Sequence, residues 1–445
     1  MKWRNLGIVT ALLLVLGAYV YYFEIQGEKK KEEAKEKEQK LFPIESKDVT
    51  GITLHSPEGE IVLVKVKDAW KLTRPLEAKA DQSTADSLAS DLASARIERT
   101  LEEMNPVWKT YGLDPPSLKL SFKLNNGKSH ELELGEKDFS ESYAYARVPG
   151  QNKVLLVSVS LVNDANKKLF DFRDKTLLEF KRDEVKALQI TLKGKTYRLD
   201  KSGDNWLIQE PFQGRADRSE IDSISSELEY SKVEQYVDNP EKDLKTYGLS
   251  APDIRLDLFL GENKSRKTLL IGNKVDALYY AKEEARDTIF KIKEDLYKKL
   301  NFDPQKIRDK KLFRFDRAEM TNLEVKLKDK KFVFFKGSDS QWKMSEPGGY
   351  KGKYITEYRL FWPLEDLEAK EFIEKASLTD AQYGFAQPEA EVRLIDKNKK
   401  YIELALGKLE KDQLYVKVLG DSTIYKVDKK VLDDLNFKLN DLIEK

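Results

Sequence analysis

The side chains that most often transfer protons or bind metals are scarce in this sequence. The chain contains no cysteine, which excludes disulfides, thiolate nucleophiles and cysteine-ligated zinc or iron–sulfur clusters. Its two histidines are 75 residues apart, with His55 in a predicted turn and His130 at the start of a predicted strand. Surface or edge positions explain both. We therefore predict no metal site, no cofactor and no catalytic residue, and we expect a protein that is not an enzyme.

Two short segments resemble catalytic motifs without satisfying them. Ser340 to Lys343 reads SQWK and matches S-x-x-K, but it overlaps a repeated tryptophan and leads into a predicted strand. Lys193 to Tyr197 reads KGKTY, but a phosphate-binding loop needs a glycine where Gln189 stands. The 78 carboxylates show no spacing that singles out a catalytic pair, so solvated faces are the default interpretation.

Tyrosines on predicted strands are the remaining candidates for a binding site. A shared pocket would be lined by the following residues: Tyr143, Tyr145, Tyr279, Tyr280 and Tyr415. Strands are commonly rich in tyrosine, so packing in a core or hairpin is the favoured interpretation.

Composition indicates a folded, water-facing body. The chain has 445 residues, of which 40% are apolar and 35% charged, and its 20 Tyr, 20 Phe and 6 Trp argue against disorder. Basic and acidic residues nearly cancel, 79 against 78, and no long basic block occurs. A nucleic-acid partner is therefore not predicted.

The body repeats itself with a period of 136 residues. Five sets of residues recur at this interval, represented by Trp70, Trp206 and Trp342, and the sets also include a proline after each tryptophan and the Tyr, Gly and Pro of a later turn. The period exceeds that of solenoid repeats, so it indicates tandem copies of a whole domain. A second echo, RDKTLLEF at 173–180 against RDKKLFRF at 308–315, places the copies at 41–176, 177–311 and 312–445.

Each copy is predicted to be an α+β domain with a mostly antiparallel sheet and two helices. Apolar residues alternate with polar ones from Leu118 to Leu124 and from Ile254 to Leu260, which is typical of strands with one buried face. The predicted order is three strands, a helix, a turn, four strands and a second helix, with glycine ending the second of the four strands (Gly135, Gly272 and Gly407).

The first helix of each copy has a predicted start and, in the third copy, a predicted break. Ser83 and Ser219 are expected at the N-cap, with Asp86 and Asp222 three residues later. In the third copy, Pro363 inside the pattern predicts a kink or a split.

A recurring turn, TYGLDPP at 110–116, returns as TYGLSAP and QYGFAQP. It suits a chain that needs positive φ at Gly112 and an extended entry into the next strand at Pro116. Because it occurs once per copy, a role in the fold is favoured over a chemical site.

The N-terminus is predicted to anchor the body in a membrane. A short tail (1–5) precedes an apolar span (6–25), long enough as a helix to cross a bilayer, and a charged stalk (26–40) follows. A cleaved signal peptide is the rival interpretation, but the small-residue cleavage pattern is missing. Basic residues flank the span on both sides; the short cationic tail favours a cytoplasmic N-terminus and an extracytoplasmic, periplasmic body.

The apolar N-terminus, the tandem α+β copies, the YGL turn, the RDKxLxxF junction and the LxLG strands together resemble the bacterial domain-of-unknown-function family 4340. The resemblance covers nearly the whole chain after Leu41, and the third copy departs most, at Gln382, Phe385 and Pro363. Members are often encoded beside ABC-transport components similar to the gliding-motility type. The resemblance thus implies an accessory, envelope-facing role in a membrane-protein complex, and it assigns no catalytic residues.

Three hypotheses for the function follow from these features. The leading one is a single-pass, membrane-anchored, non-enzymatic scaffold or accessory subunit of an ABC-type export or envelope complex. The second is a module that binds an envelope glycan or similar ligand through exposed tyrosines. The third is a carboxylate-dependent hydrolase, whose sign would be a cluster of carboxylates with shifted pKa values in one copy.

Overall fold

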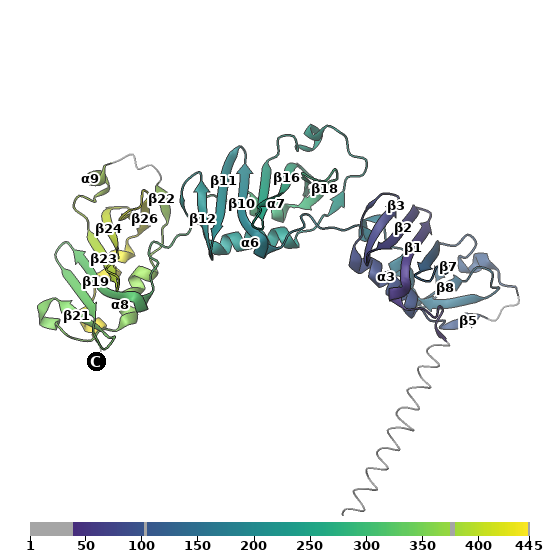
Figure 1. Cartoon of the computed structure of the whole chain (residues 1–445), viewed down its shortest axis with the longest axis horizontal. Coiled ribbons are helices and arrows are strands. Elements are labelled where there is room, and N and C mark those ends of the chain that lie inside the picture. Colours follow the sequence, from purple (N-terminus) through teal and green to yellow (C-terminus); the bar gives the residue numbers. More distant parts are fainter. Residues whose placement is uncertain (1–38, 102–104, 374–378, 444–445) are drawn as a thin grey trace, which may run out of the picture. The chain divides into compact units, whose positions relative to one another are not determined.

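The computed structural model describes residues 39–101, 105–373 and 379–443 (Figure 1). The predicted tail (1–5), the span (6–25) and the stalk up to residue 38 lie outside the described residues. Within the part that is described, none of the helices has the length and apolar character needed to cross a bilayer. The chain divides into two compact units, one ending at Thr176 and the other running from Leu177 to Lys445.

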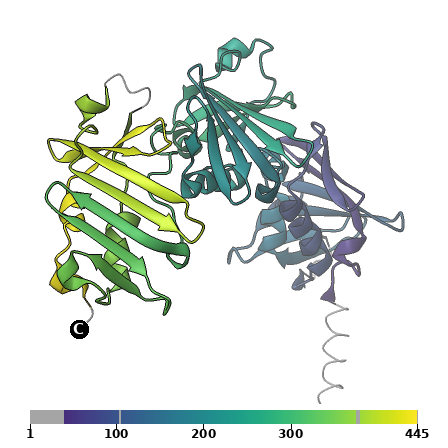
Figure 2. The same ribbon diagram turned by 60° about the vertical axis from the view of Figure 1, so that its left-hand side comes forward.

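Three antiparallel sheets form the body, one in the first unit and two in the second. Their strand orders are β4-β3-β2-β1-β6-β7-β8-β9-β5, β13-β12-β11-β10-β15-β16-β17-β18-β14 and β21-β20-β19-β23-β24-β25-β26-β22. The three orders are equivalent except that the third sheet lacks one edge strand. In each sheet the first and the fourth long strands pair, although two other long strands, a helix and a turn separate them in sequence. Figure 2 shows this pairing in the third sheet, where green β19 (Met320–Leu327) lies beside yellow β23 (Ala390–Asp396).

The elements of the three copies follow the same order, although the third has no counterpart of β4 and β13 and the second no counterpart of α5 and α11 among the described residues. In the first copy they are β1 (Val49–Ser56), β2 (Gly59–Val66), β3 (Ala69–Arg74), β4 (Ala78–Lys79), α3 (Gln82–Ser94), β5 (Arg99–Leu101), η3 (Trp108–Tyr111), β6 (Leu118–Leu124), β7 (Ser129–Lys137), β8 (Tyr143–Arg147), β9 (Val154–Ser158), α4 (Val159–Ala165) and α5 (Leu169–Phe172). In the second they are β10 (Val185–Leu192), β11 (Lys195–Ser202), β12 (Asn205–Glu210), β13 (Gly214–Arg215), α6 (Arg218–Tyr230), β14 (Gln235–Tyr236), η5 (Leu244–Tyr247), β15 (Ile254–Leu260), β16 (Ser265–Val275), β17 (Leu278–Glu283), β18 (Ile289–Lys293) and α7 (Glu294–Leu300). In the third they are β19, β20 (Lys331–Lys336), β21 (Trp342–Glu346), α8 (Glu357–Glu365), β22 (Glu371–Ile373), α9 (Asp380–Tyr383), β23, β24 (Tyr401–Glu410), β25 (Gln413–Val418), β26 (Ile424–Asp428), α10 (Lys430–Leu435) and α11 (Leu439–Leu442).

The main core of each copy lies between one face of the sheet and the helices, as α3 and α6 show in Figure 1. The alternating leucines of β6 and β15 are buried on this face, which confirms the period-two prediction. The repeated tryptophans close this core, since Trp70, Trp206 and Trp342 are 1%, 5% and 1% exposed. Their spacing therefore reflects burial of a large aromatic ring in the same place three times.

The first helix begins earlier than the serines predicted. The N-cap residues are Asp81 and Asp217, whose carboxylates accept backbone N–H bonds from Thr84 at 2.9 Å and from Ser219 at 2.8 Å. The expectation of Ser83 and Ser219 at the N-cap was therefore wrong by two residues. Aspartate caps helices as well as serine does, and here it is the residue next to the sheet.

Two further expectations needed correction. Short strands that the sequence did not reveal form the sheet edges: β4 and β5 in the first copy, β13 and β14 in the second and β22 in the third. They have only two or three residues, too few to show any periodicity. In the third copy the predicted split at Pro363 is wrong, because α8 starts at Glu357 and continues through the proline to Glu365; the alternative of a kink stays a prediction.

The last residues of each copy are hydrogen-bonded to the start of its first helix. Backbone N–H groups of the N-cap residues Asp81, Asp217 and Thr356 donate to the carbonyls of Phe172, Ile307 and Leu442 at 2.8–2.9 Å. These bonds satisfy backbone groups at the helix start and close each copy on itself.

Candidate functional site

The YGL turn packs against a β-bulge on the face of the sheet that is not covered by the helices. Gly112, Gly248 and Gly384 adopt φ of 65°, 71° and 86° at the C-terminus of a short helix, which confirms the predicted positive φ. The carbonyl of the preceding tyrosine then reaches Gly135, Gly272 or Gly407, where an added Cβ would lie 2.1–2.2 Å from that oxygen. The strands continue two or three residues past these glycines, with a register shift, so the glycines bulge the strands rather than end them.

The predicted tyrosine candidates mostly pack beneath this turn. Ring centroids are 4.8 Å apart for Tyr111 and Tyr145, 5.0 Å for Tyr247 and Tyr280, and 5.0 Å for Tyr383 and Tyr415. In the second and third copies these rings belong to a small second core on the outer face of the sheet. Tyr279 stacks on Tyr297 at 3.9 Å, and Tyr143 starts β8. Each of these ring pairs therefore lies within a single copy.

The two histidines occupy separate structural environments. His55, half exposed on β1, has Nε2 3.7 Å from the carboxylate of Glu60. The ring of His130 lies 5.1 Å from that of Phe42 and 5.3 Å from that of Phe122. Both positions are explained by packing and pairing at the surface of the first sheet.

The near-matches to catalytic motifs form hairpin turns. Lys193 and Gly194 carry positive φ in the turn between β10 and β11. In the S-x-x-K segment, Lys343 pairs with Asp339 at 2.7 Å, and this hydrogen bond raises the pKa of the lysine. A lysine that acts as a general base needs a lowered pKa, so the environment of Lys343 opposes that role.

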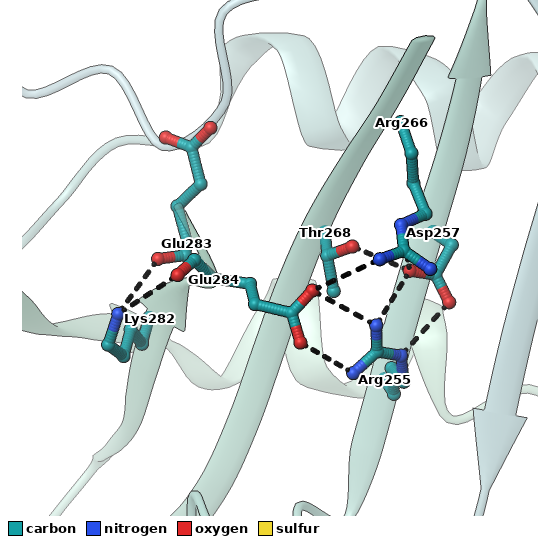
Figure 3. A network of polar contacts seen from close by, with 7 residues as sticks. All are labelled: Arg255, Asp257, Arg266, Thr268, Lys282, Glu283 and Glu284. Atoms are coloured by element: carbon teal, nitrogen blue, oxygen red, sulfur yellow. Dashed lines mark hydrogen bonds and ion pairs between the residues drawn. The ribbon is translucent and has the colours of Figure 1, made fainter. Parts of the chain in front are cut away.

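A cluster of charged residues on the outer face of the second sheet is the polar site that the sequence did not reveal (Figure 3). Arg255 and Asp257 lie on β15, Arg266 and Thr268 on β16, and Glu284 just after β17. Strand pairing sets Asp257 opposite Thr268, so the cluster crosses neighbouring strands. The side chain of Glu283 points away from the other groups and pairs with Lys267 and Arg286.

Asp257 is the centre of this cluster and is only 2% exposed. Its carboxylate accepts hydrogen bonds from Thr268 Oγ1 at 2.6 Å and from Arg255 Nε at 3.1 Å. Arg255 also donates to both oxygens of Glu284, at 2.9 and 3.1 Å. Arg266 lies 3.9 Å from Asp257 and 3.7 Å from Glu284. A buried carboxylate is thus compensated by two guanidinium groups and a hydroxyl.

The hydrogen bonds between Arg255 and Glu284 favour the charged form of both side chains. The hydrogen bond from Arg255 lowers the pKa of Glu284, and the same bond raises the pKa of Arg255. A general acid or base needs a pKa close to the working pH, which neither group has. The arrangement is therefore a cross-strand ion-pair network that ties β15, β16 and β17 together. Its only sequence signal was the polar pair Arg255 and Asp257 within an alternating strand, which favours a solvated face.

The outer faces of the other two sheets carry different charges at similar places. In the first copy, Glu133 pairs with Arg147 at 2.6 Å and with Lys119 at 3.6 Å. In the third copy, Arg393 donates to Glu403 at 2.7 Å and lies over the ring of Tyr401. The copies thus share their buried framework and differ in the charges that they present.

A pair of carboxylates lies between two helices of the first copy. Asp91 on α3 and Asp164 on α4 interact, with Ser160 Oγ 3.4 Å from Asp91 and Lys167 Nζ 2.9 Å from Asp164. Burial, followed by the neighbouring charge of Asp164, raises the pKa of Asp91. This is the shifted carboxylate that the hydrolase hypothesis asked for, but it lies in a contact between helices.

Replacing Asp91 with asparagine is expected to stabilise the first copy at neutral pH by about 0.5 kcal/mol or less, since solvent screens much of the repulsion. Because the folded pKa of Asp91 is raised, its ionisation opposes folding above that pKa and not below it. The gain of Asp91→Asn should therefore be present at pH 7 and vanish toward pH 3. Urea unfolding at the two pH values measures it, and an equal gain at both would contradict the assignment.

Among its described residues the site contains no metal centre, and comparison with known proteins identifies the family of the chain. Across the ranges that the structure describes, no group of three or more His, Asp or Glu side chains is arranged to hold a metal. None of the curated proteins matches the chain. The model of one family, described as a domain of unknown function (DUF4340), matches residues 70–252, 206–381 and 358–445. These matches cover more than half of the sequence, so the chain belongs to the DUF4340 family.

Proposed function

We propose that the chain is a non-enzymatic scaffold or accessory subunit of an ABC-type export or envelope complex, anchored in the inner membrane through residues 6–25. The three copies would lie on the periplasmic side, held off the bilayer by the stalk at 26–40. The assignment to an export complex comes from the family resemblance, and the membrane attachment comes from the apolar sequence of the N-terminus.

The observation that carries the proposal is the contrast between the residues that the three copies share and the residues in which they differ. The residues that recur at the 136-residue period build the main core, the turn and the bulge, as Trp70, Gly112 and Gly135 do in the first copy. The residues that differ include the charged side chains on the outer faces of the sheets. A repeated frame that carries variable exposed charges is suited to recognising several surfaces of a partner.

Capture of partners from detergent-solubilised membranes tests this proposal. The full chain, tagged at its C-terminus, should co-purify with membrane proteins. Reversing one exposed charge on each outer face (Lys119→Glu, Arg266→Glu and Lys326→Glu) should reduce that capture at least tenfold. The matched control places the same changes in helices or helical turns: Lys47→Glu, Lys298→Glu and Lys430→Glu. All six side chains are more than half exposed. Because Arg266 also compensates the buried Asp257, circular dichroism must show that the sheet-face variant is folded before its capture is compared with that of the control.

Equal capture by the two variants would contradict a role for the sheet faces, and a chain recovered only as a monomer would contradict the scaffold itself. The compartment needs its own measurement. Protease added to intact cells should leave the body whole, and protease added to spheroplasts should degrade it. Degradation in neither preparation would place the body in the cytoplasm.

A further inference from the structure

The first copy contains a cavity of about 350 Å³ at the end of its sheet. The apolar part of its lining, the floor, includes Leu54, Ile61, Leu118 and Leu169. Charged side chains of both signs also line it: Glu58, Glu60, Lys167 and Lys168, of which Glu60 pairs with Arg74 at 2.9 Å. It lies where the β1–β2 hairpin faces the segment that follows α4. Pockets of this size accept small organic ligands.

The other two copies fill the equivalent place with aromatic rings. Strand pairing aligns Ile61 with Tyr197 and Phe332, because each faces the equivalent residue of the first strand. After the closing helix, the asparagine that ends it is followed by Phe302 in the second copy and by Phe437 in the third. The ring centroids of Tyr197 and Phe302 are 5.6 Å apart, and those of Phe332 and Phe437 are also 5.6 Å apart.

The first copy lacks both rings. Ile61 replaces one, and Lys167 stands where the phenylalanine would be. Tyr197 and Phe332 are 5% and 3% exposed, whereas Ile61 is only half buried. The floor of the site is therefore kept, and the aromatic cover is missing.

Each lysine at the cavity is paired with a carboxylate, and the Lys168 pair is the more exposed and the easier for a ligand to replace. Lys167 pairs with Asp164 at 2.9 Å, and Lys168 pairs with Glu58 at 3.8 Å. The Lys168 and Glu58 side chains are more than 70% exposed, and ion pairs this exposed contribute little. An anionic group seated above the apolar floor would find two ammonium groups within reach.

The geometry points to a binding site in the first copy for an aromatic ring that carries a carboxylate. The ring would take the place that Phe302 and Phe437 occupy in the other copies, and the carboxylate would meet Lys167 and Lys168. A free aryl carboxylate and a peptide that ends in phenylalanine share this chemistry. The site does not depend on the membrane anchor or on an export partner.

Calorimetric titration of the full chain in detergent tests the site with two probes, 3-phenylpropionate and the peptide Gly-Gly-Phe. Binding of either supports the site, and the probe that binds at least tenfold more tightly identifies the source. Amidation of the peptide's carboxyl group should weaken its binding at least fivefold, and Lys167→Met/Lys168→Met should weaken the acid to a similar extent.

A plugged variant supplies the decisive control. Ile61→Tyr/Lys167→Phe copies the second copy's residues and should abolish binding while circular dichroism stays unchanged. The reverse change, Tyr197→Ile/Phe302→Lys/Asp303→Lys, supplies both lysines in the second copy; it should open a second site and raise the stoichiometry from one to two. Absence of binding by both probes would overturn the proposal, as would undiminished binding by a folded plugged variant; the cavity would then be a solvent-filled depression only.

Discussion

Replacing Gly272 with alanine is expected to destabilise the second copy by about 3 kcal/mol, at the upper end of what overpacking costs. The new Cβ would lie 2.2 Å from the carbonyl oxygen of Tyr247 and 2.9 Å from the carbonyl carbon of Gly248. Both contacts are with backbone atoms, so no change of rotamer relieves them. The turn must move away from β16, which uncovers the small core formed by Tyr247, Leu249 and Leu270.

Hydrogen exchange read by mass spectrometry locates this effect within the full chain. Amides at 237–249 and 269–275 should lose protection in Gly272→Ala, whereas those of the first copy should keep it. The matched control is Gly214→Ala, because an added Cβ at Gly214 meets no atom within 4 Å. That control should change the free energy of unfolding by less than about 0.5 kcal/mol. Equal protection in the two variants would show that the turn does not depend on the bulge.

The role of the turn was predictable from the sequence, but its partner was not. Tyr-Gly-Leu indicates positive φ at Gly112, and the structure has it there. Gly135 was predicted to end a strand, because a single glycine says nothing of the carbonyl that approaches it. That approach joins residues more than 20 positions apart in sequence, and local periodicity does not report it.

The polar site and the cavity also depend on contacts between residues that are distant in sequence, which local patterns do not show. A charged residue within an alternating strand indicates a solvated face, so burial of Asp257 follows only once its neighbours on β16 and β17 are known. The cavity did leave a signal, since lysine at 167 differs from phenylalanine at 302 and 437. Reading that signal required the strand register, which pairs these positions with Ile61, Tyr197 and Phe332.

Replacing Arg255 with methionine is expected to cost the second copy about 2 to 3 kcal/mol at pH 7, below the full loss of a buried pair because Arg255 is 31% exposed. The change leaves the buried carboxylate of Asp257 with Thr268 at 2.6 Å and with Arg266 no closer than 3.9 Å. Urea unfolding measures the loss. The control is Arg218→Met, which breaks an exposed pair on α6 and should cost only about 0.3–0.5 kcal/mol.

The pH dependence of this loss has a definite sign. In the unmodified chain, the lowered pKa of Glu284 contributes stability above the unfolded pKa, and that stability is lost as the pH falls through the folded value. The variant lacks this contribution, because Arg255 is the donor that lowers the pKa of Glu284. The difference in unfolding free energy between the two proteins should therefore shrink from pH 7 to pH 3.

Removing the buried charge together with its partner separates burial from pairing. The double variant Arg255→Met/Asp257→Leu removes the buried charge at position 257. The ion pair of Arg266 and Glu284, 3.7 Å apart at the surface, is left in place. Replacing both members of a buried pair with apolar groups is often neutral, so the double variant should recover most of the stability lost in Arg255→Met. A double variant as unstable as the single one would mean that the packing of the Arg255 side chain across the strands, and not the charge of Asp257, holds this face together.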